Sequence, residues 1–272
     1  MKEVNVLSFG AGVQSTALAL LSGNQKTSIP VFDFGIFSDT GAEPDSVYDC
    51  LEKVKKHVSF PIITAIHKKG LKHSIHEAKQ TGSGFVGVPF FTKKENGSIG
   101  MLRRQCTNHY KIQPVHKEIR KQLGYNKGQH VKHRVNVFIG ISRDEMTRMT
   151  TPQHKWMNHV YPLVQMEWTR SHCLDFLKKE WNHEVGKSSC TFCPYHDNQA
   201  WREMKNNDPN SWNEALMIDE TIRNGFQHTK ESLYLHRLGV PLKTIDFDAI
   251  LARQDDQIDF GFQEECEGMC GL

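Results

Sequence analysis

The clearest chemical signal in the sequence is the run of small and hydroxyl residues at Ser8–Thr16, Ser-Phe-Gly-Ala-Gly-Val-Gln-Ser-Thr. Small residues let backbone N–H groups approach a phosphate closely, and a following helix adds the positive end of its dipole. The hydroxyls of Ser15 and Thr16 can donate further hydrogen bonds. The run has neither the lysine of the Walker P-loop nor the spacing of GxGxxG. It predicts a phosphate-binding turn, with a turn that merely packs as the alternative.

Two more charged motifs follow apolar runs. Asp39 lies in Ser38-Asp39-Thr40-Gly41-Ala42-Glu43, where it can accept from a ribose or adenine, hold a metal, or cap a helix. Arg143 and Arg148 follow a later apolar run, and their forked donors can clamp phosphate or sulfate or form surface ion pairs.

Seven cysteines suggest metal or redox chemistry rather than a secreted disulfide framework. Cys190-Thr-Phe-Cys193 is half of a zinc or iron–sulfur site, or a redox pair. Cys106 is the natural third ligand because Arg103, Arg104 and Lys111 nearby favour thiolate. The fourth position is open or filled by one of four candidates: Cys266, Cys270, His109 and His196.

Two of these cysteines lie in an acidic end segment. Cys266 and Cys270 can reach into a site or bind a metal there, and neighbouring carboxylates raise thiol pKa values.

Helices and strands must position these motifs. Apolar runs at 4–9, 31–37, 60–66 and 135–141 predict buried strands, and helical spacing follows the first two. This alternation predicts an α/β fold, a Rossmann-like parallel sheet with helices on both faces. We expect a nucleotide-binding domain over 1–165 with a hairpin flap at 82–105, a helical portion carrying the CxxC over 166–253, and an acidic, flexible cysteine-containing tail over 254–272.

The net charge of +3 conceals an uneven distribution. Residues 51–150 contain 20 Lys/Arg against 6 Asp/Glu, while the other 172 residues contain 14 against 25. This asymmetry predicts an anionic ligand or partner for the middle of the chain, a solvated basic face being the alternative. No apolar run reaches the roughly 18 residues of a membrane span, and no secretory signal is evident, so we expect a cytoplasmic protein without a membrane partner.

Taken together, the motifs resemble those of the phosphoadenosine-phosphosulfate reductase family, within the PP-loop (adenine nucleotide alpha hydrolase-like) superfamily. The resemblance covers most of the chain and is carried by the segments already described, together with Tyr161-Pro162-Leu163, Trp168-Thr169 and Glu265-Cys266.

The resemblance implies a Rossmann-like sheet that binds ATP, adenosine phosphosulfate (APS) or phosphoadenosine phosphosulfate (PAPS). The implied nucleotide-binding residues are Ser8, Gly10, Gly12, Gln14, Ser15, Thr16, Asp39, Arg143 and Arg148, with Arg103, Arg104 and Lys111 as further anion ligands. Cys106, Cys190 and Cys193 would hold a [4Fe–4S] cluster, or alternatively zinc, and Cys266, with Cys270 nearby, would be the catalytic thiol.

Three departures from the family pattern qualify this expectation. Gln14 stands where ATP-cleaving members usually have an acidic residue, which favours the reductases. Gln105-Cys106 replaces the adjacent cysteines of cluster-type reductases, and the tail carries two cysteines instead of one.

The leading hypothesis is therefore a sulfonucleotide reductase in which Cys266 attacks sulfur and a thiol reductant resolves the product. The alternative is an ATP-dependent sulfurtransferase that modifies tRNA or DNA bound through residues 51–150 and receives sulfur from a donor protein. A non-catalytic nucleotide-binding protein is the third possibility.

Overall fold

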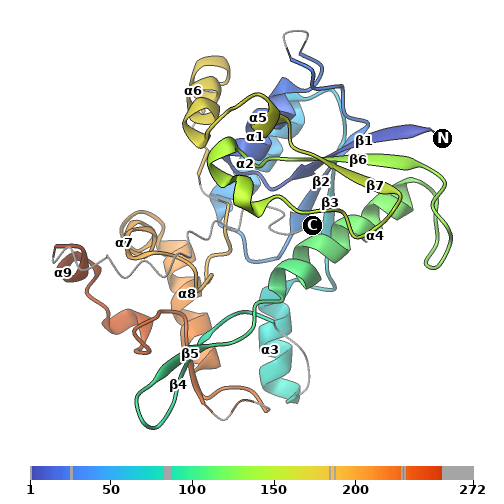
Figure 1. Ribbon diagram of the computed structural model, residues 1–272. Helices are drawn as coiled ribbons and strands as arrows, with labels where there is room; N and C mark the ends of the chain where they lie inside the picture. The colour runs from blue at the N-terminus through green and yellow to red at the C-terminus, as the bar shows by residue number, and fades with distance from the viewer. Residues whose placement is uncertain are drawn as a thin grey trace. The chain divides into compact units, whose positions relative to one another are not determined.

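The computed structural model describes residues 2–24, 27–82, 87–183, 185–186, 188–227, 229 and 231–252. Within these ranges the chain forms two compact units (Figure 1). Unit 1 contains residues 2–68 and 107–188, and unit 2 contains residues 69–106 and 189–252. Each unit thus combines two separate segments of the chain, whereas the sequence predicted consecutive domains.

Unit 1 is built on a parallel sheet. Its strands are β1 (Glu3–Phe9), β2 (Phe34–Asp39), β3 (Ile62–Ile66), β6 (Arg134–Ile139) and β7 (Met157–Val160), in the order β3-β2-β1-β6-β7. Ser8 in the central strand is in register with Ile36 on one side and Ile139 on the other. All four strand pairs are parallel, so the predicted α/β, Rossmann-like fold class is confirmed.

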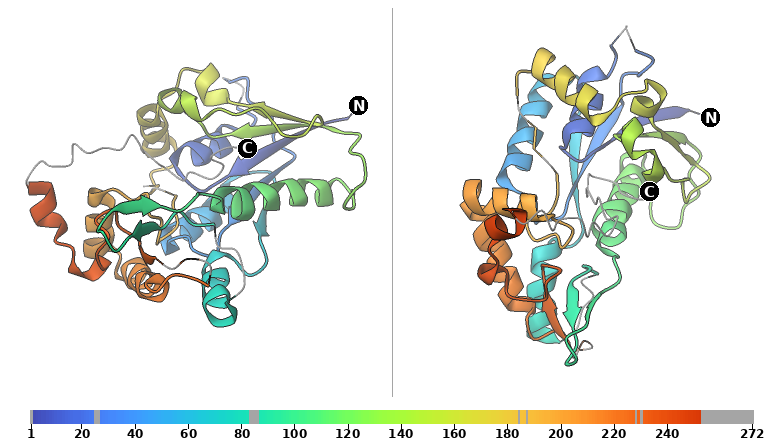
Figure 2. Two further views of the ribbon diagram at one scale, coloured as in Figure 1. Left: turned by 60° about the horizontal axis from the view of Figure 1, so that its bottom comes forward. Right: turned by 60° about the vertical axis from the view of Figure 1, so that its left-hand side comes forward.

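Helices cover both faces of this sheet (Figures 1 and 2). Leu7 and Phe9 of β1 share one apolar core with α1 (Val13–Leu21), α2 (Asp45–His57) and α6 (Arg170–Glu180). Val4 and Val6 of β1 point into a second core, which includes α4 (Gln113–Gln122). Alternate residues of the strand are buried on opposite faces, which explains why the strands read as continuous apolar runs.

The second strand begins later than its apolar run predicted. Val31 is 59% exposed, and β2 starts only at Phe34. Between them, Asp33 is bound to the start of the sheet: its carboxylate accepts a hydrogen bond from the Asn5 N–H at 2.7 Å. Tertiary contacts therefore set this boundary rather than residue type.

Unit 2 combines a small antiparallel sheet with helices. The sheet has the order β5-β4-β8, from β4 (Phe91–Lys93), β5 (Ile99–Met101) and β8 (Ser232–Tyr234). The helices are α3 (Leu71–Thr81), α7 (Asn198–Asn207), α8 (Pro209–Ile222) and α9 (Phe247–Ala252). The predicted hairpin is confirmed, with Gly97 of its Asn-Gly turn at φ 83°. On the side away from β5, β4 pairs with β8 in the antiparallel sense.

Short helices complete the described chain. They are a π-helix at Thr107–Ile112, 3₁₀ helices at Arg143–Arg148 and Leu242–Thr244, and α5 (Pro162–Gln165). No helix among the described residues has the length and apolar character needed to cross a bilayer.

A close backbone contact joins the loop after β6 to the first turn of α1 in unit 1. Gly140 directly follows β6, and a Cβ placed on it would lie 2.7 Å from the Ser15 nitrogen and 2.9 Å from the Ser15 Cα. Backbone atoms cannot move aside as the end of a long side chain can. Only glycine therefore fits where the loop after β6 meets the first turn of α1.

We expect Gly140→Ala to lower the free energy of unfolding by about 1–3 kcal/mol, as other overpacking substitutions do. The measurement is urea denaturation, with Gly186→Ala as the matched control, because a Cβ on Gly186 meets nothing within 4 Å. Equal stability of the two variants would contradict the close contact.

Candidate functional site

The predicted phosphate-binding turn connects β1 to α1. Ala11 adopts the left-handed conformation at φ 55° although it carries a Cβ, and it is 1% exposed. Gly12 is the N-cap of α1. The Ser15 hydroxyl closes the turn: it accepts from the backbone N–H groups of Gly10 at 3.3 Å and Gly12 at 3.2 Å. The turn is thus a fixed, buried loop that leads into a helix N-terminus.

Ser188, at the end of unit 1's second chain segment, also holds this turn: its hydroxyl donates to the carbonyl of Gly10 at 2.5 Å.

Two predicted phosphate ligands are buried beside the turn. Thr16 is fully buried, and its hydroxyl lies 3.6 Å from the Cys50 sulfur of α2. Ser8 is buried within β1. Thr16 and Ser8 therefore belong to the packed support of the loop, and their role as phosphate ligands stays a prediction.

Gln14 connects the turn to the charged segment after β6. Its side-chain amide donates to Glu145 at 3.1 Å and to the Ser142 hydroxyl at 3.4 Å, and its carbonyl accepts from Arg170 at 3.2 Å. Both ends of the amide are used, which a carboxylate could not do because it cannot donate. This gives a structural reason for glutamine at position 14.

The two arginines predicted to clamp an anion lie in different surroundings. Arg148 forms an ion pair with Glu145 at 2.6 Å, and both side chains are largely buried. The Arg143 side chain is 56% exposed and lies 3.7 Å from Glu167. The structure thus places Arg148 in the Gln14 network and Arg143 at the surface.

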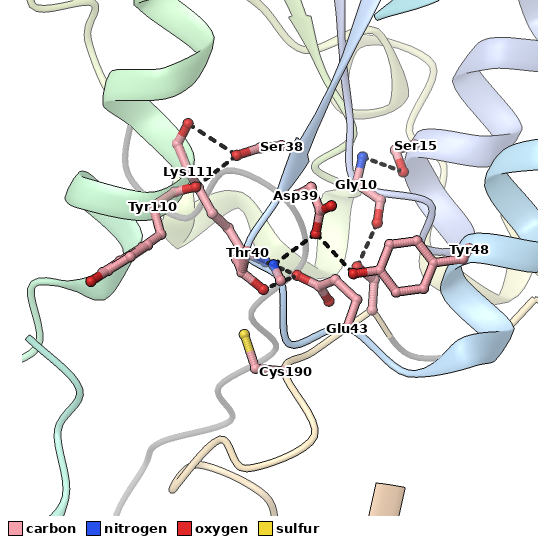
Figure 3. A network of polar contacts seen from close by, with 12 residues as sticks. Gly10, Ser15, Ser38, Asp39, Thr40, Glu43, Tyr48, Tyr110, Lys111 and Cys190 are labelled. Carbon is pink, nitrogen blue, oxygen red and sulfur yellow. Dashed lines mark hydrogen bonds and ion pairs between the residues drawn. The ribbon is translucent and has the colours of Figure 1, made fainter. Parts of the chain in front are cut away.

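Asp39 ends β2, next to the turn (Figure 3). Its carboxylate accepts from the Gly41 N–H at 2.7 Å and from the Tyr48 hydroxyl at 2.8 Å. Burial and the Asp39 carboxylate both raise the pKa of Tyr48, so the phenol stays protonated and keeps donating. Asp39 is therefore held in one orientation at the carboxyl end of the sheet.

A buried ion pair lies beside Asp39 (Figure 3). The Lys111 ammonium is 3.5 Å from Glu43, and the two side chains are 3% and 1% exposed. Thr40 donates to the same Glu43 oxygen at 2.9 Å. The Ser38 hydroxyl donates to the carbonyls of Tyr110 and Lys111, which fastens the π-helix to β2. Lys111, predicted as an anion ligand, thus has a carboxylate counterion within unit 1.

Positive charge also surrounds the end of β3. His67 lies edge-on to Tyr110, with ring centroids 5.2 Å apart. Burial lowers the pKa of His67, and the charges of Lys68, His109 and Lys117 lower it further. The imidazole is therefore neutral near pH 7, and the ammonium groups of Lys68 and Lys117 supply positive charge near it in unit 1.

The remaining predicted residues of the middle segment lie in unit 2. Arg103 is exposed, and the Arg104 guanidinium lies 5.1 Å from the centroid of the Tyr195 ring. The backbone N–H groups of Gln105 and Cys106 both donate to the Gly87 carbonyl at 2.8 Å. Arg103 and Arg104 belong to unit 2, whereas Lys111 belongs to unit 1.

The Cys190–Cys193 pair forms a tight turn in unit 2. The Cys193 N–H donates to the Cys190 carbonyl at 3.0 Å, and His196 Nε2 lies 2.9 Å from the same carbonyl. Cys190 is buried and Cys193 is partly exposed.

Cys266 and Cys270, predicted to be catalytic, lie outside the described residues. Within the described ranges, no three His, Cys, Asp or Glu side chains are grouped so that they could hold a metal ion.

The sequence interpretation missed several residues of this network. Tyr48, Glu43, Ser142, Glu145 and Arg170 orient Asp39, Lys111 or Gln14. Glu43 lies inside the Asp39 motif, and Ser142 and Glu145 lie beside Arg143, so polar residues directly after strand ends were the available signal. The partners of Gln14 lie 128–156 positions away, so spacing could not have paired them.

Similarity to known proteins is found among solved structures. No family model matches the sequence, and no curated protein matches it. Among solved structures, the chain is similar to the phosphoadenylyl-sulfate (PAPS) reductase of Candida auris in a phosphate complex, with 15% identity and a TM-score of 0.41. The match covers 70% of this chain and 80% of that one. The α/β architecture of unit 1 is established by the parallel pairing of its own strands.

Lys111→Met should lower the free energy of unfolding by about 3–5 kcal/mol, because it leaves the buried Glu43 carboxylate without its counterion. Adding Glu43→Gln should recover part of this loss by removing the charge. Urea denaturation measures both effects.

The matched control is Lys55→Met, which breaks an exposed ion pair with Glu52 and should cost less than about 1 kcal/mol. Losses of the same size at positions 111 and 55 would show that the buried pair does not hold the π-helix in place.

Proposed function

We propose that unit 1 binds an adenine nucleotide with its phosphate or sulfate group at the Gly10–Thr16 turn, and that the protein is a sulfonucleotide reductase-like enzyme. The observation that carries the proposal is the left-handed, buried Ala11 between two glycines, directly before a helix. A strained residue of this kind costs about 1–3 kcal/mol and is typical of ligand-binding loops. Such turns can aim successive N–H groups at an anion, and we expect an anion here to compete with the Ser15 hydroxyl for the N–H groups of Gly10 and Gly12.

The sheet topology supports a ligand at the same place. The chain extends the sheet from β1 to β2 and β3 in one direction, and through β6 and β7 in the other. Ligands of open parallel sheets bind outside the carboxyl ends of the strands where this direction reverses. The turn after β1 and the charged loop after β6 both lie at that point, joined by the contact of Gly140 with Ser15.

Different residues around the turn can bind different parts of the ligand. Asp39, held by Tyr48 and the Gly41 N–H, presents a carboxylate oxygen that can accept a ribose hydroxyl. The exposed Arg143 can approach a sulfate or phosphate with its forked donors. Arg148 acts through its ion pair with Glu145, which also accepts from Gln14.

The proposed reaction begins with the Cys266 thiolate. Its sulfur attacks the sulfate sulfur of APS or PAPS, an S–S bond forms, and the S–O bond to the nucleotide phosphate breaks. The nucleotide leaves with that oxygen and its electron pair, so the enzyme retains a thiosulfonate. One thiol of a dithiol reductant then attacks the Cys266 sulfur, which breaks the S–S bond to the sulfonate, releases sulfite and leaves a mixed disulfide. The second thiol attacks this mixed disulfide, so that the Cys266 thiolate is freed and the reductant, having supplied two electrons, becomes a disulfide.

The resemblance also implies a [4Fe–4S] cluster or zinc. The described cysteine, histidine and carboxylate side chains test this implication only in part. Cys190 and Cys193 have the C-x-x-C spacing of a two-thiolate chelate and are joined by a backbone hydrogen bond within one turn. Within the described residues, however, no group of three suitable ligands is assembled. The described donors thus do not form a complete site, and the reaction above uses no metal. Metal binding by Cys106, Cys190 and Cys193 stays a prediction.

Matched substitutions at position 11 test nucleotide binding. Ala11→Gly should keep the affinity for ATP, APS and PAPS, because glycine adopts φ 55° without strain. Ala11→Val should weaken binding at least tenfold, because a β-branched residue resists this conformation in a buried loop. Isothermal titration calorimetry measures both affinities, and thermal melting confirms that each variant is folded.

Equal affinities of the two folded variants would contradict phosphate binding at this turn.

A separate substitution tests the chemistry. Cys266→Ser should abolish sulfite release from APS and PAPS, because a hydroxyl is a far weaker nucleophile than a thiolate, while nucleotide affinity stays unchanged. Sulfite is measured in single-turnover assays with a dithiol reductant. Sulfite release by this variant at the wild-type rate would exclude Cys266 as the attacking group.

A further inference from the structure

Unit 2 contains a cavity that the proposed nucleotide site does not use. Its volume is about 490 Å³, within the range of small-molecule sites. One wall comes from the hairpin, with Phe91 and Met101, and another from Tyr195 and His196, which follow the cysteine turn. Arg237, just after β8, contributes a positive charge. All lining residues belong to unit 2.

Three polar groups of the wall are occupied within the fold. His236 Nε2 is paired with Asn198 at 2.9 Å, and burial lowers the pKa of His236 to about 4, so the ring is neutral. His196 binds the Cys190 carbonyl. Asp197 caps α7 by accepting from the Ala200 N–H at 2.6 Å. The rest of the lining includes the Phe91 and Tyr195 rings, the Met101 thioether and the Arg237 side chain.

These surfaces favour a flat aromatic ring that carries negative charge nearby. Phe91, Tyr195, His196 and His236 bring aromatic rings to the lining, and methionine sulfur contacts ring edges favourably. The Arg104 guanidinium, 5.1 Å from the Tyr195 ring centroid, adds a second cation beside the wall. Aromatic platforms flanked by Arg and Lys are how proteins bind unpaired nucleotides.

We propose that this cavity binds a nucleobase, from a free nucleotide or from an unpaired position in a single strand, as a second site apart from the turn of unit 1. The base stacks on Tyr195, and its phosphate meets the positive charge of Arg104 and Arg237. Because His196 joins the cavity wall to the Cys190 carbonyl, the bound base lies beside the Cys190–Cys193 turn.

The test uses the full-length protein with Ser15→Ala, which weakens the turn of unit 1 so that the second site is seen alone. The probes are the four ribonucleoside monophosphates and a 12-nucleotide single-stranded RNA, titrated by calorimetry. Tyr195→Ala should weaken binding about tenfold, the order expected for losing one stacking platform. Tyr195→Phe keeps the ring and should restore the affinity.

The source of the base follows from the comparison of probes. RNA binding that is tighter than monophosphate binding and weakens with salt identifies a single strand, while equal affinities identify a free nucleotide. The absence of binding by every probe, or affinities that Tyr195→Ala leaves unchanged, would overturn the proposal. Neither result touches the proposed function, because ATP binding to the protein with Ser15 intact is measured separately.

Discussion

The arrangement of unit 1 depends on one close approach between backbones. Gly140, at the end of β6, lies against Ser15 so closely that no Cβ fits between them. This contact holds the loop after β6 against the turn after β1. Gln14 then bridges the two loops through Glu145, Ser142 and Arg170. The contact thus places Glu145, which is also paired with Arg148, beside the turn after β1.

Buried polar pairs give this edge its rigidity. Glu43 and Lys111 are almost inaccessible, and Thr40 adds a hydrogen bond to the same carboxylate. Removing charges from water is unfavourable unless each is paired, so the pair holds its two segments in one arrangement. Asp39 is fixed similarly by Tyr48, whose pKa is raised by burial and by the carboxylate itself. A site prepared in this way can bind a charged ligand with little reorganisation.

Sequence patterns predicted the parallel sheet and the motif positions well, because apolar periodicity and small-residue turns are local signals. Ser8–Thr16 and Asp39 both lie at the predicted edge. The patterns could not show that Lys111 faces Glu43, or that Gln14 is used at both ends, because those partners lie far away in sequence. They also gave no sign that residues 69–106 join residues 189–252 in one unit, since β8 pairs with a hairpin about 140 positions earlier. Cys266 and Cys270 lie outside the described residues, so their predicted role rests on sequence alone.

The central claim is that the turn after β1 is the phosphate site. The most direct measurement is a ¹⁵N NMR titration of the protein with APS, following the backbone amides of residues 10–16. Because the resonances of N–H groups that bind an anion shift strongly, we expect the largest changes at Gly10–Ser15, at the same ligand concentration that saturates binding in calorimetry. Saturable binding of APS with these amides unmoved would contradict it.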